Sequence, residues 1–330
     1  MCVVALAWES WNPVTGCTHV SAGCAHCYAE RFAERWRGIP GHHYERGFEL
    51  MLRPERLELP LHWRAPRHVF VTSMGDLFHE DVPDEYVRRV FDVMARAPQH
   101  VFHVLTKRER RLLALAGDLP WPANVHMGVT VEEMAVAHRA DVLRAVPAAL
   151  RHVSAEPLLG PLDELDLSGI AWVIAGGESG PARRPPRVEW LRDLRDLCLA
   201  TGVPFTFKGW GGAVQGALGR TLDGRRWDDE PAELAAARRR AGAPPPQATL
   251  WESRPTGGEA ALSGDVCRRL GGRVVRRPAR VAQRLDFVPA ARGAQRHAHR
   301  AVGDDAGDLE PLPARQAGEQ AGRTQGEPPG

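Results

Sequence analysis

The sequence contains almost no lysine. Lys107 and Lys208 are the two lysines among its 43 basic residues, and arginine supplies the rest. A lysine kept in such an arginine-rich chain is worth locating, because its compact ammonium group is not interchangeable with the planar guanidinium of arginine. The composition therefore marks both lysines as candidates for a specific role.

Long apolar runs are also missing. No stretch approaches the roughly 18 consecutive apolar residues of a membrane-spanning helix, so we expect no membrane partner. The opening residues, MCVVALAWES, lack the basic region and the cleavage site of a signal peptide. These absences predict a cytoplasmic protein, in which cysteines stay reduced and clustered cysteines bind metal more often than they form disulfides.

Three of the six cysteines fall in one short segment, CTHVSAGCAHC, as Cys17, Cys24 and Cys27. Three thiolates this close together can hold one soft metal ion or a cluster and leave one coordination position open. His19 or His26 would instead complete a closed Cys3His zinc site. Burial of the cysteines as small core residues is a third interpretation, which their small and polar neighbours disfavour. The residues alone leave cluster and zinc open.

Short β-branched runs alternate with amphipathic stretches, which is typical of a parallel α/β fold. Strands are expected at residues 3–9, 68–73, 100–106, 124–131, 150–156, 170–177 and 203–209. Helices are expected at residues 27–36, 84–97, 108–116, 132–146 and 188–200. Because seven strands are too few for a closed eight-fold barrel, we predict a partial (β/α) barrel of about six to seven parallel strands. A doubly wound sheet is the alternative.

This alternating pattern ends near residue 231. We predict one barrel domain over residues 1–231 and a low-complexity tail over residues 232–330, rich in Arg, Ala, Gly and Pro and mostly disordered. The tail holds 16 arginines and 11 acidic residues, a net charge of +5 that would suit nucleic acid. A genomic base composition that favours arginine codons would explain the same arginines.

Polar residues gather where the expected strands end. In parallel α/β folds the active site lies at the carboxyl ends of the strands, so we expect these residues to share one cavity with the cysteine segment. The candidates are Asp76, Lys107, Ser154, Glu156, Gly176, Gly177, Glu178 and Lys208. The segment GGESG is compatible with an anion bound by backbone N–H groups or with a ligand amine bound by Glu178. Asp76 in a turn and Glu156 before a proline also have purely local explanations.

Seven motifs follow one another along the chain: WNPVTGC, a C-x6-C-x2-C spacing, SMGDLFHEDVP, LTKR, SAEPLLGP, GGESG and FKGWGG. In these motifs and in their order the chain resembles the bacteriophage-associated three-cysteine-motif family of unknown function, itself distantly similar to radical SAM enzymes. The resemblance runs from about Trp8 to Pro231 and does not reach the tail. Most radical SAM enzymes have C-x-x-x-C-x-x-C, so this cysteine segment is three residues longer.

The resemblance implies a [4Fe–4S] cluster on the three cysteines, with S-adenosylmethionine on the open iron. It implies an enzyme that reductively cleaves S-adenosylmethionine, with electrons from a reductase, to start radical chemistry on an unknown small molecule or nucleotide. The residues implied for the cofactor are Ser154, Glu156, Gly176, Gly177 and Glu178, and those implied at the reacting centre are Lys107, Lys208 and Asp76. Either lysine would meet a carboxylate or phosphate. The alternative is a zinc-stabilised nucleic-acid-binding module of phage or prophage origin without catalysis.

Overall fold

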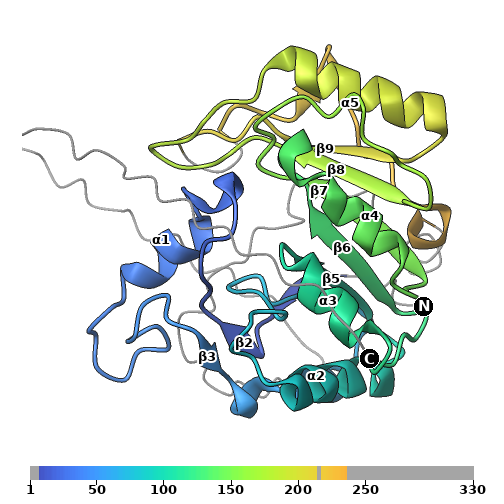
Figure 1. Cartoon of the computed structure of the whole chain (residues 1–330). Helices are drawn as coiled ribbons and strands as arrows, with labels where there is room; N and C mark the ends of the chain where they lie inside the picture. Colours follow the sequence, from blue (N-terminus) through green and yellow to red (C-terminus); the bar gives the residue numbers. More distant parts are fainter. Residues whose placement is uncertain (1–6, 214–216, 236–330) are drawn as a thin grey trace, which may run out of the picture. The chain divides into compact units, whose positions relative to one another are not determined.

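The protein is described by a computed structural model that covers residues 7–213 and 217–235. Within these residues, seven strands form one parallel sheet in the order β1-β4-β5-β6-β7-β8-β9 (Figure 1). These strands are β1 (Ala7–Trp11), β4 (Arg67–Val71), β5 (Val101–Thr106), β6 (Val125–Thr130), β7 (Leu150–Ala155), β8 (Trp172–Gly176) and β9 (Phe205–Gly209). Two small antiparallel pairs complete the strands: β2 (Val14–Thr15) with β3 (Met51–Leu52), and β10 (Thr221–Leu222) with β11 (Arg225–Arg226).

Helices connect the strands of the sheet. They are α1 (Tyr28–Glu34), α2 (Asp84–Arg96), α3 (Glu109–Ala116), α4 (His138–Arg144) and α5 (Val188–Thr201). Short 3-10 turns lie at Ala22–Cys24, Pro54–Arg56, Leu59–His62 and Met134–Val136. Helices α3, α4 and α5 run along one side of the sheet, and α1 lies on the other side (Figure 1).

The order of the strands settles the architecture. Each strand of the sheet pairs with the next one along the chain, and β1 and β9 remain as its two edges. A doubly wound sheet would reverse its strand order at a switch point, and this sheet does not reverse. The partial (β/α) barrel with seven parallel strands is therefore confirmed.

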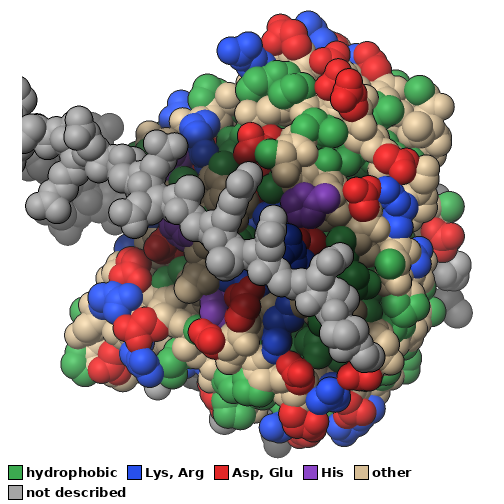
Figure 2. Space-filling view, viewed as in Figure 1, with side chains coloured by type: hydrophobic (Ala, Val, Ile, Leu, Met, Phe, Trp, Pro, Cys, Tyr) green, Lys and Arg blue, Asp and Glu red, His purple; other side chains and the backbone are tan. Residues whose placement is uncertain are grey.

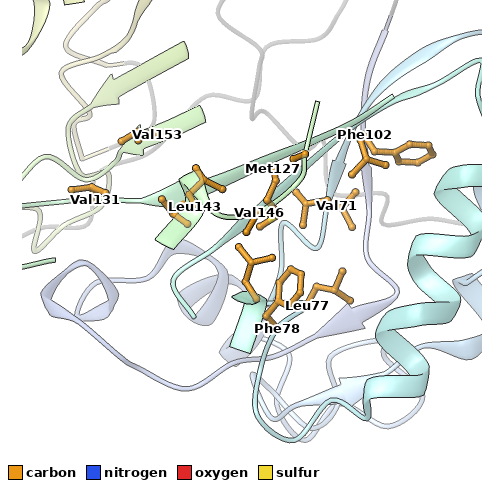
Figure 3. Packing of buried hydrophobic residues seen from close by; sticks show 14 of the residues in the cluster. Val71, Leu77, Phe78, Phe102, Met127, Val131, Leu143, Val146 and Val153 are labelled. Atoms are coloured by element: carbon orange, nitrogen blue, oxygen red, sulfur yellow. The ribbon is translucent and has the colours of Figure 1, made fainter. Parts of the chain in front are cut away.

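The side of the sheet that faces the helices is apolar. Alternate residues of the strands point to the same side, and on this side they are the Val, Phe and Met residues of the main core. Figure 3 shows Val71, Phe102 and Met127, which come from three neighbouring strands, among the side chains of this core cluster. Burying each large side chain of this kind contributes roughly 2–3 kcal/mol, which makes this layer the main source of stability.

Helix α2 illustrates how the sequence determines where a helix begins, where it ends and which side it buries. It begins after Pro83, carries Asp84 and Glu85 in its first turn, and ends just before Pro98. Acidic residues favour a helix N-terminus, and a proline cannot continue a helix beyond its first turn. Its buried residues, Tyr86, Val87, Val90, Phe91, Val93 and Met94, recur at the three- and four-residue spacing that places them on the core side.

The other side of the sheet carries a layer of buried histidines. His68, His103, His126 and His152 come from four neighbouring strands, and Trp172 of β8 continues the layer. The rings of His68 and His103 share a hydrogen bond of 3.1 Å, and the rings of His103 and His126 lie 5.0 Å apart in an edge-to-face arrangement. A Cβ on Gly128 would lie 2.2 Å from the His152 ring, so glycine leaves the room that this ring fills. These rings occupy the interior of the half-barrel.

Burial lowers the pKa of three of these histidines, His103, His126 and His152. It lowers the pKa of His152 from 6.5 to about 4, against a hydrogen bond with the Met127 backbone that favours the charged form. Burial and the neighbouring His152 and His68 lower the pKa of His126 to about 3. For His103, burial and the same neighbours shift the pKa well below its usual value.

Two segments differ from the sequence-based expectations. The helix expected at 132–146 is shorter, because Glu132 is drawn into contacts with the cysteine segment and α4 begins at His138. The folded region also continues past residue 231, since Leu234 is buried against Trp172 and Ile174. Residues 236–330 lie outside the described residues, so the predicted disorder of the tail stays a prediction.

None of the helices in the described residues combines the length and the apolar character needed to cross a bilayer.

The histidine layer predicts a stability that falls in mild acid. The unfolded chain takes up protons on histidine near pH 6.5, whereas the folded chain takes up the proton of His152 only near pH 4. Lowering the pH from 8 to 5 therefore costs about 2 kcal/mol of unfolding free energy for this residue alone. We expect the measured slope of unfolding free energy against pH, from urea titrations between pH 5 and 8, to become shallower in His152→Gln.

The matched control is His62→Gln, at an exposed histidine. It should leave the slope unchanged. An unchanged slope in His152→Gln would contradict the prediction, whatever the absolute stability of that variant.

Candidate active site

The cysteine segment begins just after β2 and is fixed there by the backbone. Gly16 bridges Gly75, which follows β4, and its N–H donates to the Met74 carbonyl at 2.8 Å. Gly16 has φ +84°, and a Cβ on it would lie 2.1 Å from the Glu49 carbonyl oxygen. Only glycine tolerates both the left-handed backbone and this close approach. The backbone that precedes Cys17 is therefore fixed beside the turn that follows β4.

Cys24 and Cys27 lie on a tight turn that leads into α1. The Cys27 N–H donates to the Cys24 carbonyl at 3.1 Å, and the first residue of α1 follows directly. Cys17 and Cys27 pack against a small cluster that contains Ala29 and Phe48. Cys17, Cys24 and Cys27 are all free thiols and all partly exposed. The segment therefore presents three thiols that are in no disulfide.

Burial dominates the ionisation of two of these thiols. Burial and the Asp76 carboxylate raise the pKa of Cys17 to about 12, although the Arg108 guanidinium acts in the opposite direction. Burial also raises the pKa of Cys27, against the N–H groups of Glu30 and Ala29 at the start of α1. Both are thiols at neutral pH in the free protein, so a metal that binds them must displace their protons.

Arg108 connects the first cysteine to the strand ends. Its side chain is 3% exposed, and its Nη1 lies 3.4 Å from Cys17 Sγ and 3.5 Å from Asp76 Oδ2. Its Nη2 donates to the Thr18 hydroxyl at 2.8 Å and to the Thr18 carbonyl at 3.1 Å. A buried guanidinium in such contacts holds the cysteine segment against β5.

Glu132 holds the middle of the segment. Its Oε1 accepts hydrogen bonds from the Ser21 hydroxyl and, at 3.2 Å, from the Gly23 N–H. Its Oε2 is paired with Arg139 at 2.9 Å, and neither side chain is more than 4% exposed. A buried carboxylate with a buried cation and two further donors is well satisfied, and removing one partner is costly.

Glu178 holds the end of the segment before Cys27. Its Oε2 accepts from His26 Nδ1 at 2.9 Å, and its Oε1 is paired with Arg184 at 2.6 Å. Burial alone would raise the pKa of Glu178, but the hydrogen bonds from Arg184 and His26 outweigh it and lower the pKa to about 2. Arg184 also donates to the Ala22 carbonyl at 3.0 Å, so the pair reaches two points of the cysteine segment.

Asp76 is saturated with hydrogen bonds. It accepts from the Thr106 hydroxyl at 2.8 Å and from the N–H groups of Phe78 and Lys107 at 3.0 and 3.1 Å. Arg108 is also in contact with Asp76, so the hydrogen-bonding positions of the Asp76 carboxylate are occupied and a substrate proton would have to displace one of these donors. This geometry favours a positioning role for Asp76 over proton transfer.

The strand ends and the cysteine segment line one cavity of about 280 Å³. It contains every candidate residue from the sequence: Cys17, Cys24, Cys27, Asp76, Lys107, Ser154, Glu156, Gly176, Gly177, Glu178 and Lys208. The expected gathering of these residues is thus observed, and their individual chemical roles stay predictions.

Another part of the cavity wall carries a half-buried ion pair. Lys208 Nζ lies 3.0 Å from Glu156 Oε1, and the Ser154 hydroxyl donates to Glu156 Oε2 at 3.0 Å. Burial lowers the pKa of Lys208, and Glu156 partly offsets that effect. A Cβ on Gly176 would lie 2.8 Å from Glu156 Oε1, and one on Gly177 2.3 Å from the Trp210 carbonyl oxygen. Glycine at both positions therefore allows the Glu156 side chain and the Trp210 backbone to pack closely in the cavity wall.

Some residues of the site carry no signal in the sequence. Arg139 and Arg184 lie on connections after the strands, and one arginine looks like another in a chain so rich in them. Thr72 lies at the end of β4 with φ +58°, a backbone conformation that is rare for a β-branched residue. The position of His26 between two cysteines predicts a metal ligand, and it gives no sign of the contact with Glu178.

The matching region of the chain identifies its family. Residues 3–231, which include the whole cavity, match the family described as protein of unknown function (DUF5131). The chain belongs to this family. No match is found among curated proteins. The association with bacteriophages stays a prediction.

Among solved structures, this DUF5131 chain is similar to two of spore photoproduct lyase. One is a mutant with bound AdoMet and dinucleoside spore photoproduct, with a TM-score of 0.36 and 11% identity over 57% of this chain and 60% of that one. The other is the lyase complexed with dinucleoside spore photoproduct, with a TM-score of 0.36 and 11% identity over 56% and 59% of the two chains. The chain thus spans about 60% of the lyase, and a likeness this remote carries no argument about function.

The Glu132 contacts predict a loosened cysteine segment in Glu132→Gln. The substitution keeps the shape of the side chain but leaves the buried Arg139 with only its longer contact to Glu109 at 3.6 Å, which should cost about 3 kcal/mol of unfolding free energy. Hydrogen exchange over residues 17–27 should become faster because the segment loses a charged acceptor. Glu133→Gln, at the half-buried neighbouring carboxylate, is the control. Equal effects of the two substitutions would contradict the assignment.

Proposed function

We propose that the protein is a radical SAM-like iron–sulfur enzyme. The observation that carries the proposal is that three free thiols of one short segment line the same cavity as the polar strand ends. The proposal assigns Cys17, Cys24 and Cys27 to a [4Fe–4S] cluster, which three thiolates hold with one iron left open. Such a cluster, when bound together with S-adenosylmethionine, supplies one electron for reductive cleavage of the sulfonium.

The donor set suits a cluster better than a single ion. Within the described residues, no group of three or more His, Cys, Asp or Glu side chains is arranged to hold one metal ion. A cubane of four irons is larger than one ion, and its thiolate ligands are accordingly further apart. Three thiols that line one cavity are compatible with that larger group.

The protein's own residues would orient and enclose the reactants. Arg108, Glu132 and Glu178 fix the cysteine segment at three points, which limits the geometries in which its thiols can bind. Ser154, Glu156 and the Gly176–Glu178 turn form the wall that we assign to S-adenosylmethionine, and Lys107 and Lys208 face the space left for a substrate. An external electron donor, such as a reductase, is required by this proposal.

One observation favours the zinc alternative. His26 donates to Glu178, and metal-binding histidines commonly donate their second ring N–H to a carboxylate. A nucleic-acid-binding module would, however, present a basic surface. On the part of the molecule that Figure 2 shows uncovered, acidic and basic side chains are interspersed. The iron–sulfur enzyme is therefore the better-supported function.

Metal analysis of anaerobically reconstituted protein tests the proposal. We expect about four irons per chain and a brown colour, and we expect Cys24→Ala to lose both. Cys198→Ala, at a free cysteine buried in the core, is the control and should keep them. Colourless protein after reconstitution with iron and sulfide would refute the proposal, and one tightly held zinc per chain would support the alternative.

A second prediction concerns Arg108. A donor near a cluster ligand stabilises the more negative, reduced form and so raises the reduction potential. Lys is shorter than Arg and has no planar fork, so Arg108→Lys should weaken the contact with Cys17 Sγ and lower the midpoint potential. An anaerobic redox titration followed by electron paramagnetic resonance measures this shift. Arg110→Lys, at an exposed arginine of α3, should leave the potential unchanged.

A further inference from the structure

The charges in the cavity wall are paired with one exception. Asp76 is paired with Arg108, Glu156 with Lys208 at 3.0 Å, and Glu178 with Arg184 at 2.6 Å. Lys107 also lines the cavity, and its ammonium group lies 3.4 Å from the Thr130 hydroxyl. Among the ion pairs of the described residues, none includes Lys107. The wall therefore carries one positive charge that no carboxylate balances.

Thr72 supplies a second and independent observation. Its side chain lines the same cavity and is 3% exposed, and its hydroxyl has no hydrogen-bond partner within the described structure. Its backbone is held at φ +58°, although its N–H still donates to the Trp11 carbonyl at 2.7 Å. A buried hydroxyl without a partner is unfavourable, and strained backbone of this kind is concentrated at ligand sites. The residue at the cavity wall therefore carries a buried hydroxyl whose hydrogen-bonding capacity is unused within the described structure.

The lysine and the two hydroxyls come from consecutive strand ends. Thr72 follows β4, Lys107 follows β5, and Thr130 is the last residue of β6. The register places these ends side by side, since Val71 pairs with Val104 and Thr106 with Val129. The pair Glu156–Lys208 lies beyond β7, on a different part of the same wall.

We propose that Lys107, Thr130 and Thr72 form a subsite for the phosphate group of the substrate. One ammonium with two hydroxyl donors suits a phosphate, which accepts from several directions, and lysine binds phosphate as a point charge. A carboxylate is more often gripped by the flat fork of an arginine, and the arginine of this wall is already engaged by Asp76 and Thr18. The substrate class is therefore a phosphate-bearing molecule. This inference rests on the proposed function only in treating the cavity as the substrate site.

Calorimetric titration of the anaerobically reconstituted full chain with inorganic phosphate tests the subsite. We expect Lys107→Met to weaken phosphate binding about tenfold or more, and Lys107→Arg, which keeps the charge, to weaken it less. Thr72→Val removes only the hydroxyl and should weaken binding by a smaller factor. The control is Arg110→Met, which removes an exposed positive charge of α3 outside the cavity and should bind phosphate as the wild type does.

The outcomes separate the possible sources of the anion. Titration with S-adenosylmethionine is run in parallel, because that ligand carries a carboxylate. Loss of phosphate binding with unchanged S-adenosylmethionine binding supports the subsite. Absence of phosphate binding by the wild type, equal phosphate binding by Lys107→Met, or a loss confined to S-adenosylmethionine overturns it. Iron content, measured on the same samples, reports on the proposed function separately, since protein without iron that binds phosphate through Lys107 contradicts only the cluster.

Discussion

The site depends on buried charged side chains that cross from the strand ends to the cysteine segment. Arg108, Glu132 and Glu178 come after three different strands, and each contacts a different part of the segment. Such contacts are strong because the groups are buried and their remaining hydrogen-bonding positions are filled by Asp76, Arg139 and Arg184. A short segment with little regular structure thereby acquires the rigidity of the sheet.

The polar interior and the apolar exterior of the sheet have separate tasks. Val, Phe and Met residues on the outer side pack against the helices and stabilise the fold. The inner side carries the buried histidines within the strands and the charged groups at the carboxyl ends of the strands. A neutral polar layer can fill the interior without introducing charges that the cavity residues would have to balance. Charge is thus concentrated at the edge where the cysteines lie, which is where a cofactor and a substrate would need it.

Much of the fold follows from local patterns. The runs around Val71 and Val104 are apolar and β-branched, so their strands and the order of the barrel could be predicted, as could the gathering of polar residues after each strand. The partners of those polar residues could not be predicted. Arg108 contacts Cys17 from 91 positions away in the sequence, and no local pattern distinguishes this arginine from the others. The start of α4 was missed for a related reason, since tertiary contacts of Glu132 override its helical preference.

An open barrel has no circumference fixed by backbone hydrogen bonds, because β1 and β9 do not pair. At the carboxyl ends of the strands, side-chain contacts cross this gap instead. The cysteine segment contacts the turn after β8 through the His26–Glu178 hydrogen bond, and Arg31 of α1 donates to the Ser179 carbonyl at 3.3 Å. The cysteine segment therefore also connects the two sides of the open barrel. A group bound by its three thiols would add a further link across this gap, directly beside the cavity.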